Sequence, residues 1–196
     1  MSIFAAHNQL QVEALAARLN QTAIEWHDDP VELRGGDFSN WYVDLRVGLS
    51  EGADLKLASN ALYGRLRQAG FEEEVVAGIG VGGRMIVSGL AVCHSTLLSA
   101  WGNDDRSDQT LETGYGFHGA DVEGKKVLAV DEIASSGDSL MTLLGMIAKL
   151  GGQVDRAATI ADRSGGEVAL AMAQLGVGYT TLLKFDESRG RLAPTQ

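Results

Sequence analysis

Two adjacent carboxylates, followed closely by small hydroxyl-bearing residues and a glycine, offer the clearest chemistry in the chain. In "VLAVDEIASSGDSL" (127–140), four apolar residues lead into Asp131 and Glu132, and a Ser-Ser-Gly-Asp-Ser run begins at Ser135. Carboxylates accept hydrogen bonds from neighbouring hydroxyl groups, whereas hydroxyl and backbone N–H groups at a helix start bind phosphate. The spacing therefore predicts a sugar-phosphate site, with the acids on the sugar and the loop on the phosphate.

Simpler interpretations cover only part of this pattern. Asp138 or Ser136 could merely cap the following helix, but a cap leaves the two acids at the strand end unexplained. The apolar run and the acid pair also resemble the Walker B strand of nucleoside triphosphatases. That interpretation requires a phosphate-binding Walker A loop elsewhere in the chain.

A second glycine-rich stretch, "GIGVGGRM" (78–85), follows another apolar strand. It matches G-x-G-x-x-G, the pattern of dinucleotide-binding turns, and comes close to Walker A. Arg84 and Met85 stand where Walker A needs lysine and a hydroxyl, so the triphosphatase interpretation fails. A purely structural turn remains open, but we favour a phosphate- or pyrophosphate-binding loop whose backbone N–H groups converge on an anion. The candidate residues are Gly80, Val81, Gly82 and Arg84.

The elements that must position these loops alternate between strand and helix. We expect strands at 74–80, 95–101, 125–132, 156–163 and 178–185, and helices at 83–94, 138–152 and 166–176. This alternation predicts an α/β fold with a mainly parallel twisted sheet flanked by helices. Ligands bind beyond the carboxyl ends of such strands, at the loops after Gly78, Val130 and Ile160. The polar connection 102–124 is long enough to be a functional lid.

The N-terminal part is less regular. Apolar residues at helical spacing predict a helix at about 8–21. The stretch 25–40 contains Pro30 and two adjacent glycines, which suits turns or a short hairpin. A strand is expected at 41–45, and a helix from about Asp54, which can cap its start, to Gly70, which suits its end.

Composition limits the class of protein. The 196 residues are 45% hydrophobic, which suits one domain with a full core. A formal net charge of −10 argues against a nucleic-acid-binding surface and against an anionic membrane face. The single cysteine, Cys93, is interpreted as a small buried hydrophobe and fits a reducing cytoplasm. We find neither a secretory signal nor an apolar run long enough to span a membrane.

Four stretches of the sequence resemble segments of one protein family. "VLAVDEIASSGDS" resembles the signature with which type I phosphoribosyltransferases bind 5-phosphoribosyl 1-diphosphate (PRPP). "NWYVDLR" is similar to the early strand "PYYVDLR" of orotate phosphoribosyltransferases, and "AGIGVGGRMIVSGLA" to their pyrophosphate-loop region. "ATIADRSGG" resembles their "VVVDREEGG". The order and spacing match from about Asp37 to Phe185, which implies one domain with a small N-terminal hood (about 1–40) and a PRPP-binding core (about 41–185).

The resemblance implies a role for each candidate. Asp131 and Glu132 would bind the ribose hydroxyls, Arg163 would contact the base, and Arg106 would meet the pyrophosphate. Tyr42 and Phe38 would line the base site. The 5-phosphate would be bound by Ala134, Ser135, Ser136, Gly137, Asp138 and Ser139, and the pyrophosphate by Gly80, Val81, Gly82 and Arg84. The resemblance also implies Mg²⁺ held through PRPP rather than by a dedicated protein site, and a homodimer.

The chain departs from the family mainly on the pyrophosphate side. Glu132 stands where aspartate is usual, and Phe38 and Gly82 replace lysines. The loop that usually reads "RKEAKxHG" is "WGNDDRSDQTLETGYG" here, with Arg106 as its only cation among several acids. Two functions follow. The first is transfer of 5-phosphoribose from PRPP to a nitrogenous base, with orotate expected. The alternative is a non-catalytic regulatory or partner-binding protein that binds a ribose phosphate or nucleotide.

Overall fold

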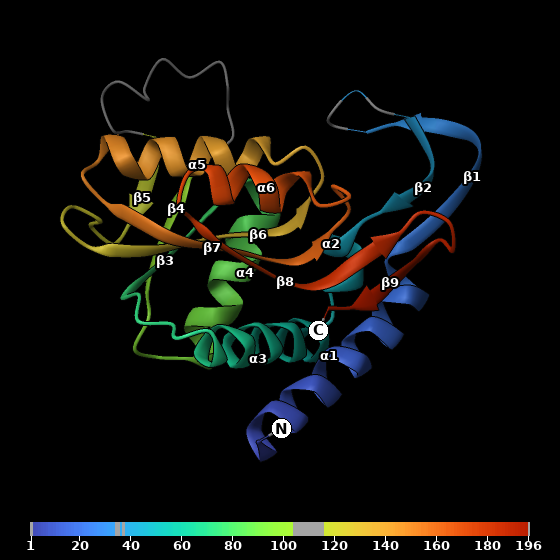
Figure 1. Ribbon diagram of the computed structural model, residues 1–196, viewed down its shortest axis with the longest axis horizontal. Helices are drawn as coiled ribbons and strands as arrows, with labels where there is room; N and C mark the ends of the chain where they lie inside the picture. The colour runs from blue at the N-terminus through green and yellow to red at the C-terminus, as the bar shows by residue number, and fades with distance from the viewer. Residues whose placement is uncertain (1, 34–35, 37, 104–115, 196) are drawn as a thin grey trace.

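The computed structural model describes residues 2–33, 36, 38–103 and 116–195. Its centre is a seven-stranded sheet in the order β5-β4-β3-β6-β7-β8-β9, in which the five inner strands are parallel and the two edge strands antiparallel (Figure 1). The strands are β3 (Val75–Ile79), β4 (Leu98–Gly102), β5 (Phe117–Gly119), β6 (Lys126–Ala134), β7 (Gln153–Asp162), β8 (Gly178–Asp186) and β9 (Arg191–Pro194). The predicted α/β class with a mainly parallel sheet is confirmed.

Helices cover both faces of this sheet, as a parallel sheet with apolar strands requires. Helices α5 (Asp138–Lys149) and α6 (Glu167–Gln174) lie on one face, and α3 (Gly52–Gln68) and α4 (Gly80–Cys93) on the other (Figure 1). Alternate residues of β3 and β6 point into two separate buried clusters, one under each helical layer. All five residues of β3 are buried. This two-sided burial fixes the strand ends from which the loops emerge.

The N-terminal segment 3–43, called the hood below, consists of a helix and a hairpin, and the hairpin reaches the cavity at the carboxyl end of the sheet. Helix α1 (Ile3–Thr22) packs on α3 and β9, and its Val12, Leu15 and Leu19 join the cluster under α3 and α4. Strands β1 (Ile24–Glu32) and β2 (Phe38–Val43) pair antiparallel as a separate two-stranded sheet. In Figure 1 this hairpin stands next to the β8–β9 hairpin.

The sequence predicted most elements within a few residues. The strands and helices expected after residue 74 are confirmed, and the N-terminal helix forms but begins five residues earlier than expected. A hairpin also forms, but its second strand, 38–43, includes most of the separate strand expected at 41–45. Three short elements were not foreseen: α2 (Leu45–Gly48), the edge strand β5, and β9, which follows the strand we expected to be the last. Short edge strands are specified by the neighbour they pair with rather than by their own apolar pattern.

The predicted cap of α3 is wrong. Helix α3 begins at Gly52 after Glu51, and Asp54 lies inside its first turn. The Asp54 carboxylate is buried and pairs with Arg18 of α1, with an Nη2–Oδ2 distance of 2.9 Å. Asp54 therefore joins two helices instead of capping one. Gly70 directly follows the helix end with a positive φ of 79°, as expected for a terminating glycine.

Among the described residues, no helix is both long and apolar enough to cross a lipid bilayer.

Candidate functional site

A cavity of about 420 Å³ opens at the carboxyl ends of β3, β6 and β7. This is the position at which open parallel sheets bind ligands, and the volume lies in the range of small-molecule sites. The lining comes from three sequence-predicted loops and from the hood. These residues are Glu32, Leu33, Tyr42–Arg46, Ile79–Gly82, Arg84, Asp131–Leu140 and Arg163.

The last part of β6 contributes the acid pair, Asp131 and Glu132, and the turn into α5 contributes the hydroxyl loop, residues 135–139. Asp131 is 6% exposed and lies three residues before the end of β6, and its Oδ1 accepts a 2.9 Å hydrogen bond from the backbone N–H of Glu132. The chain then turns through Gly137, whose positive φ of 83° only glycine adopts readily. Helix α5 starts at Asp138, whose backbone N–H donates a long hydrogen bond of 3.4 Å to the Ser136 hydroxyl, and its N-cap residue, Gly137, has no side chain. The loop therefore presents backbone N–H groups and serine hydroxyls to the cavity, which suits a phosphate.

The start of α4 lies directly against the acid pair in the cavity wall. Gly80 begins this helix with a positive φ of 66°. The Cα of Gly82 lies against the carboxylate of Glu132, so that any side chain at position 82 would overlap that carboxylate. Two positions at which the chain departs from the family pattern are therefore in direct contact. A longer acid at 132 occupies the space that a side chain at 82 would need.

The cavity is acidic, with five carboxylates among the described lining residues against three guanidinium groups. The carboxylates are Glu32, Asp44, Asp131, Glu132 and Asp138, and the guanidinium groups are Arg46, Arg84 and Arg163. Such an excess suits a ligand that arrives with a divalent cation, because Mg²⁺ prefers hard oxygen donors. In the described part of the chain, no three His, Cys, Asp or Glu side chains gather as a metal site of their own.

Arg46 is a cavity cation that the sequence reasoning did not select. It follows the hood strand β2 and lies in α2, where it binds Asp44 with an Nη2–Oδ2 distance of 2.7 Å. The hydrogen bond from Arg46 lowers the pKa of Asp44, and the same contact raises the pKa of Arg46. Its position at the end of the "WYVDLR" stretch was the available signal.

Arg84 turns toward the end of β4. Its Nη2 donates to the Asn103 side-chain oxygen at 2.5 Å and more weakly to the Gly102 carbonyl at 3.4 Å. The guanidinium thus ties α4 to the strand that precedes the long polar connection. It still lines the cavity from this position.

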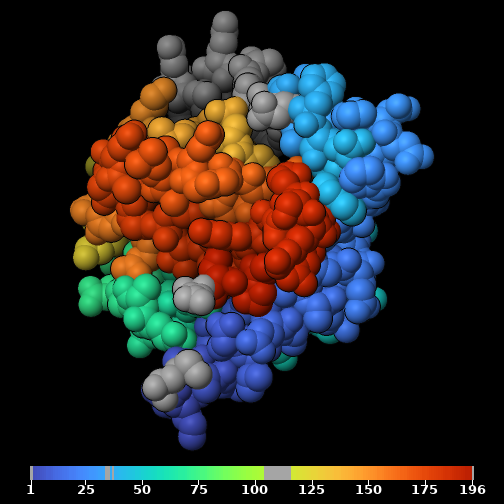
Figure 2. Space-filling model, turned by 45° about the vertical axis from the view of Figure 1, so that its right-hand side comes forward, coloured from blue at the N-terminus to red at the C-terminus, as the bar shows by residue number. Residues whose placement is uncertain are grey.

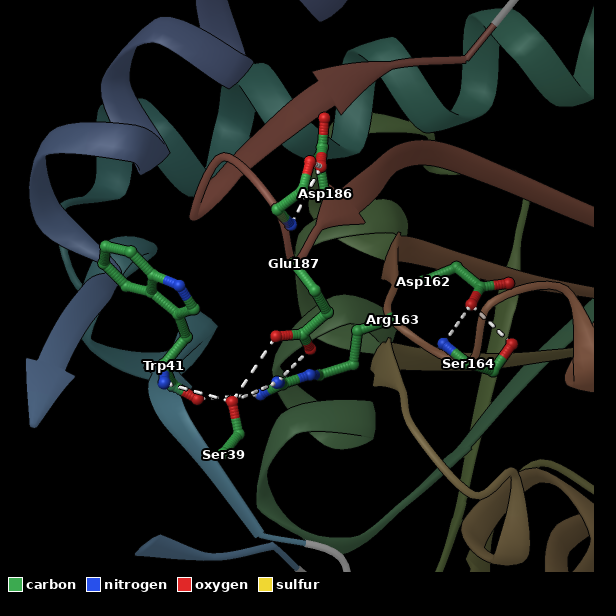
Figure 3. Close-up of polar contacts among 8 residues, drawn as sticks. Ser39, Trp41, Asp162, Arg163, Ser164, Asp186 and Glu187 are labelled. Atoms are coloured by element: carbon green, nitrogen blue, oxygen red, sulfur yellow. Dashed lines mark hydrogen bonds and ion pairs between the residues drawn. The ribbon is translucent and has the colours of Figure 1, made fainter. Parts of the chain in front are cut away.

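Arg163 joins the core to the hood (Figure 3). Its side chain is 4% exposed and lies over the Phe185 ring, 5.0 Å from the centroid. The guanidinium donates to the Trp41 carbonyl and to the Ser39 hydroxyl, both at 3.2 Å, and pairs with the carboxylate of Glu187. Neighbouring Asp162 points away and accepts hydrogen bonds from Ser164.

The structure brings most of the predicted site residues to one cavity. The acid pair, the residues of the hydroxyl loop, Gly80, Val81, Gly82, Arg84, Tyr42 and Arg163 all line it. Phe38 does not line it, and its side chain is 68% exposed on the hood. Arg106 and the other residues at 104–115 of the predicted lid lie outside the described residues, whereas the end of that stretch contains the edge strand β5.

A second, smaller cavity of about 240 Å³ lies beside α5. Its lining is mostly apolar and includes Phe117, Met141, Met146 and Leu150, with Lys149 as the charged residue. The acid pair and the hydroxyl loop are not part of it. The chemistry predicted from the sequence therefore belongs to the larger cavity.

Comparison with known proteins points to one group. No protein-family model matches the chain. The chain is 30% identical over 156 residues to the orotate phosphoribosyltransferase of Mycobacterium avium, covering 78% of this chain and 83% of the relative. It is also 30% identical over 158 residues to the orotate phosphoribosyltransferase of Methanopyrus kandleri, covering 81% of each.

Solved structures show the same fold. Orotate phosphoribosyltransferase of Mycobacterium tuberculosis in complex with PRPP superposes with a TM-score of 0.72 at 22% identity, covering 90% of this chain and 98% of that one. A phosphoribosyltransferase from Corynebacterium diphtheriae superposes with a TM-score of 0.75 at 23% identity, covering 91% and 98%.

Proposed function

Because the chain belongs to the orotate phosphoribosyltransferase family, we propose that it transfers 5-phosphoribose from PRPP to a nitrogenous base, with orotate as the expected base. One observation carries the proposal for this chain. The acid pair, the serine- and glycine-rich loop, the glycine start of α4 and Arg163 all line one cavity of about 420 Å³. A ribose, a 5-phosphate, a pyrophosphate and a base would each have a matching set of groups there.

Different residues would bind different parts of the two substrates. Asp131 and Glu132 would accept hydrogen bonds from the ribose hydroxyls, and the 135–139 loop would bind the 5-phosphate at the start of α5. The leaving pyrophosphate would lie at the start of α4. Tyr42 and Arg163 would border the base. The protein would then hold the anomeric carbon between base and leaving group, so that positioning supplies much of the rate enhancement.

The leaving group needs positive charge as it departs. Arg46 and Arg84 are the cations of the described cavity lining other than Arg163, which would border the base. Mg²⁺ bound to PRPP would supply further positive charge and would meet the excess of cavity carboxylates. The use of Mg²⁺, the homodimer and a cytoplasmic location are also parts of this proposal.

Turnover tests the proposal directly. With PRPP, Mg²⁺ and orotate, we expect the purified protein to release pyrophosphate. Asp131→Asn should lower kcat/KM by roughly 10- to 100-fold, because a charged acceptor for a ribose hydroxyl is lost. Asp155→Asn, which changes the same group on an exposed residue outside the cavity lining, should behave like the wild type. Absence of pyrophosphate release with orotate and with a panel of other bases would reject transfer.

The acidic lining favours a second candidate, a nucleotide-binding protein without transferase activity. Three guanidinium groups against five carboxylates form a weak site for a pyrophosphate. This candidate predicts that a nucleoside 5′-monophosphate binds more tightly than PRPP and that no turnover occurs. Calorimetry with both ligands, in parallel with the turnover assay, separates the two functions.

A further inference from the structure

The guanidinium of Arg163 already forms an ion pair with a carboxylate of the same chain. Glu187 follows β8 in the turn to β9, and its side chain pairs with Arg163. Ser39 of the hood joins the pair, because its hydroxyl accepts from Arg163 at 3.2 Å and donates to Glu187 at 3.4 Å. Figure 3 shows the three side chains converging from the hood, from the loop after β7 and from the β8–β9 turn.

The two partners of this ion pair differ sharply in burial. The Arg163 side chain is 4% exposed, whereas that of Glu187 is 53% exposed. A buried guanidinium without an anionic partner is costly, so Glu187 stabilises the ligand-free state. Its own carboxylate, in contrast, loses little by moving into water. A ligand carboxylate could therefore replace that of Glu187, while the guanidinium of Arg163 stays in place.

The turn that carries Glu187 is held in place independently of Arg163. Asp186 accepts hydrogen bonds from the backbone N–H and the hydroxyl of Ser188, at 3.1 and 2.6 Å. Gly190 lies so close to the Trp41 ring that any side chain there would overlap it. Figure 2 shows the contact between the hood and the C-terminal strands from outside. Glu187 can thus release Arg163 without unfolding the turn.

Arg163 also lines the cavity that holds the acid pair and the hydroxyl loop. We propose that Glu187 is an internal competitor for the Arg163 guanidinium, so that a base bearing a carboxylate must displace it while a base without one leaves the pair intact. The inference rests on the proposed function, because it concerns the base end of the same cavity. Glu187 is in this sense a specificity-determining residue that acts through Arg163.

Two nucleotides that differ only by a carboxylate test the competition without requiring turnover. Orotidine 5′-monophosphate carries a carboxylate on its base, and uridine 5′-monophosphate lacks it. In the intact protein with Glu187→Gln, which keeps the shape of the side chain but removes its charge, calorimetry should show the orotidine nucleotide bound about five- to tenfold more tightly than in the wild type. Affinity for the uridine nucleotide should stay within about twofold.

Asp186→Asn is the matched control. It removes one negative charge from the adjacent residue and keeps an oxygen that can accept from Ser188. This variant should leave the ratio of the two affinities unchanged, which separates local competition from a general change in net charge.

Each other outcome overturns the inference. An unchanged affinity ratio in Glu187→Gln would show that Glu187 does not compete with the ligand carboxylate. Equal weakening of both nucleotides would show that Glu187 is only structural. If the wild type binds neither nucleotide, the proposed function fails and the inference fails with it. If both bind and only the ratio fails to move, the proposed function stands without the competition.

Discussion

The carboxylate of Glu132 lies where a side chain at position 82 would be built. This contact links two departures from the family pattern, glutamate for aspartate and glycine for lysine. A residue with a side chain at 82 would have to push Glu132 aside. Because the three nearest atoms belong to the flexible end of Glu132, we expect the protein to keep its fold and lose the position of one acid.

Gly82→Ala therefore tests whether the placement of Glu132 matters for substrate binding. Position 82 is helical, so alanine should leave the free energy of unfolding unchanged or raise it by up to about 1 kcal/mol. PRPP affinity measured by calorimetry should fall by roughly tenfold, because the displaced carboxylate no longer meets a ribose hydroxyl.

A second substitution and a control sharpen this test. Glu132→Asp in the Gly82→Ala background should restore part of the PRPP affinity, because the shorter acid clears the new methyl group. Gly145→Ala changes a helical glycine of α5 with open space around it and should leave PRPP affinity unchanged. Equal PRPP affinity in Gly82→Ala and wild type would show that the position of Glu132 is unimportant.

At the scale of elements, the contact between α3 and the end of α4 contains a pH-sensitive stack. The rings of His94, just after α4, and Tyr63 of α3 lie parallel with centroids 3.5 Å apart. The Nε2 atom of His94 is buried and has no hydrogen-bond partner among the described residues. Burial lowers the pKa of His94, so the folded protein favours the neutral ring.

The sign of the resulting pH dependence follows from this shift. The unfolded chain binds a proton near the ordinary pKa of about 6.5, whereas the folded protein binds it only at lower pH. The contribution of His94 to stability is therefore present above about pH 6.5 and is lost as the pH falls through the lowered folded pKa.

The variant His94→Phe tests this assignment, because it keeps an aromatic ring and removes the titration. Between pH 6.5 and 5, urea unfolding should show a smaller loss of free energy of unfolding in this variant than in the wild type. Parallel losses in both proteins would contradict the assignment to His94.

At the scale of the whole molecule, acidity dominates both the cavity and the surface. The chain carries a net charge of −10, and carboxylates outnumber guanidinium groups in the described cavity lining. A polyphosphate entering alone would meet strong repulsion, and its magnesium complex, which carries less negative charge, would meet less.

Removal of divalent cations should therefore weaken PRPP binding more than nucleotide binding. With EDTA in place of Mg²⁺, calorimetry should show PRPP affinity at least about tenfold lower, because its pyrophosphate brings extra charge into an acidic site. A nucleoside monophosphate, which carries less charge, should lose less. The matched measurement is the ratio of the two affinities with and without Mg²⁺, and a constant ratio would argue against a metal-assisted pyrophosphate site.

The sequence determined the parts of this protein that depend on local pattern. Apolar strands alternating with helices specify a parallel sheet, and such a sheet fixes which loops share an edge, so Asp131 and Gly80 could be assigned to one site before any coordinates. Gly70 could be assigned to a helix end because a positive φ is a local property of glycine.

Only the tertiary structure decided which distant side chains meet. The edge strands β5 and β9 form because a neighbouring strand offers unpaired backbone groups. Asp54 forms an ion pair with Arg18 and does not cap its own helix. The Glu132–Gly82 contact and the pairing of Arg163 with Glu187 join residues 50 and 24 positions apart in the printed sequence. Charge and shape complementarity across such separations are set by packing, and no local spacing encodes them.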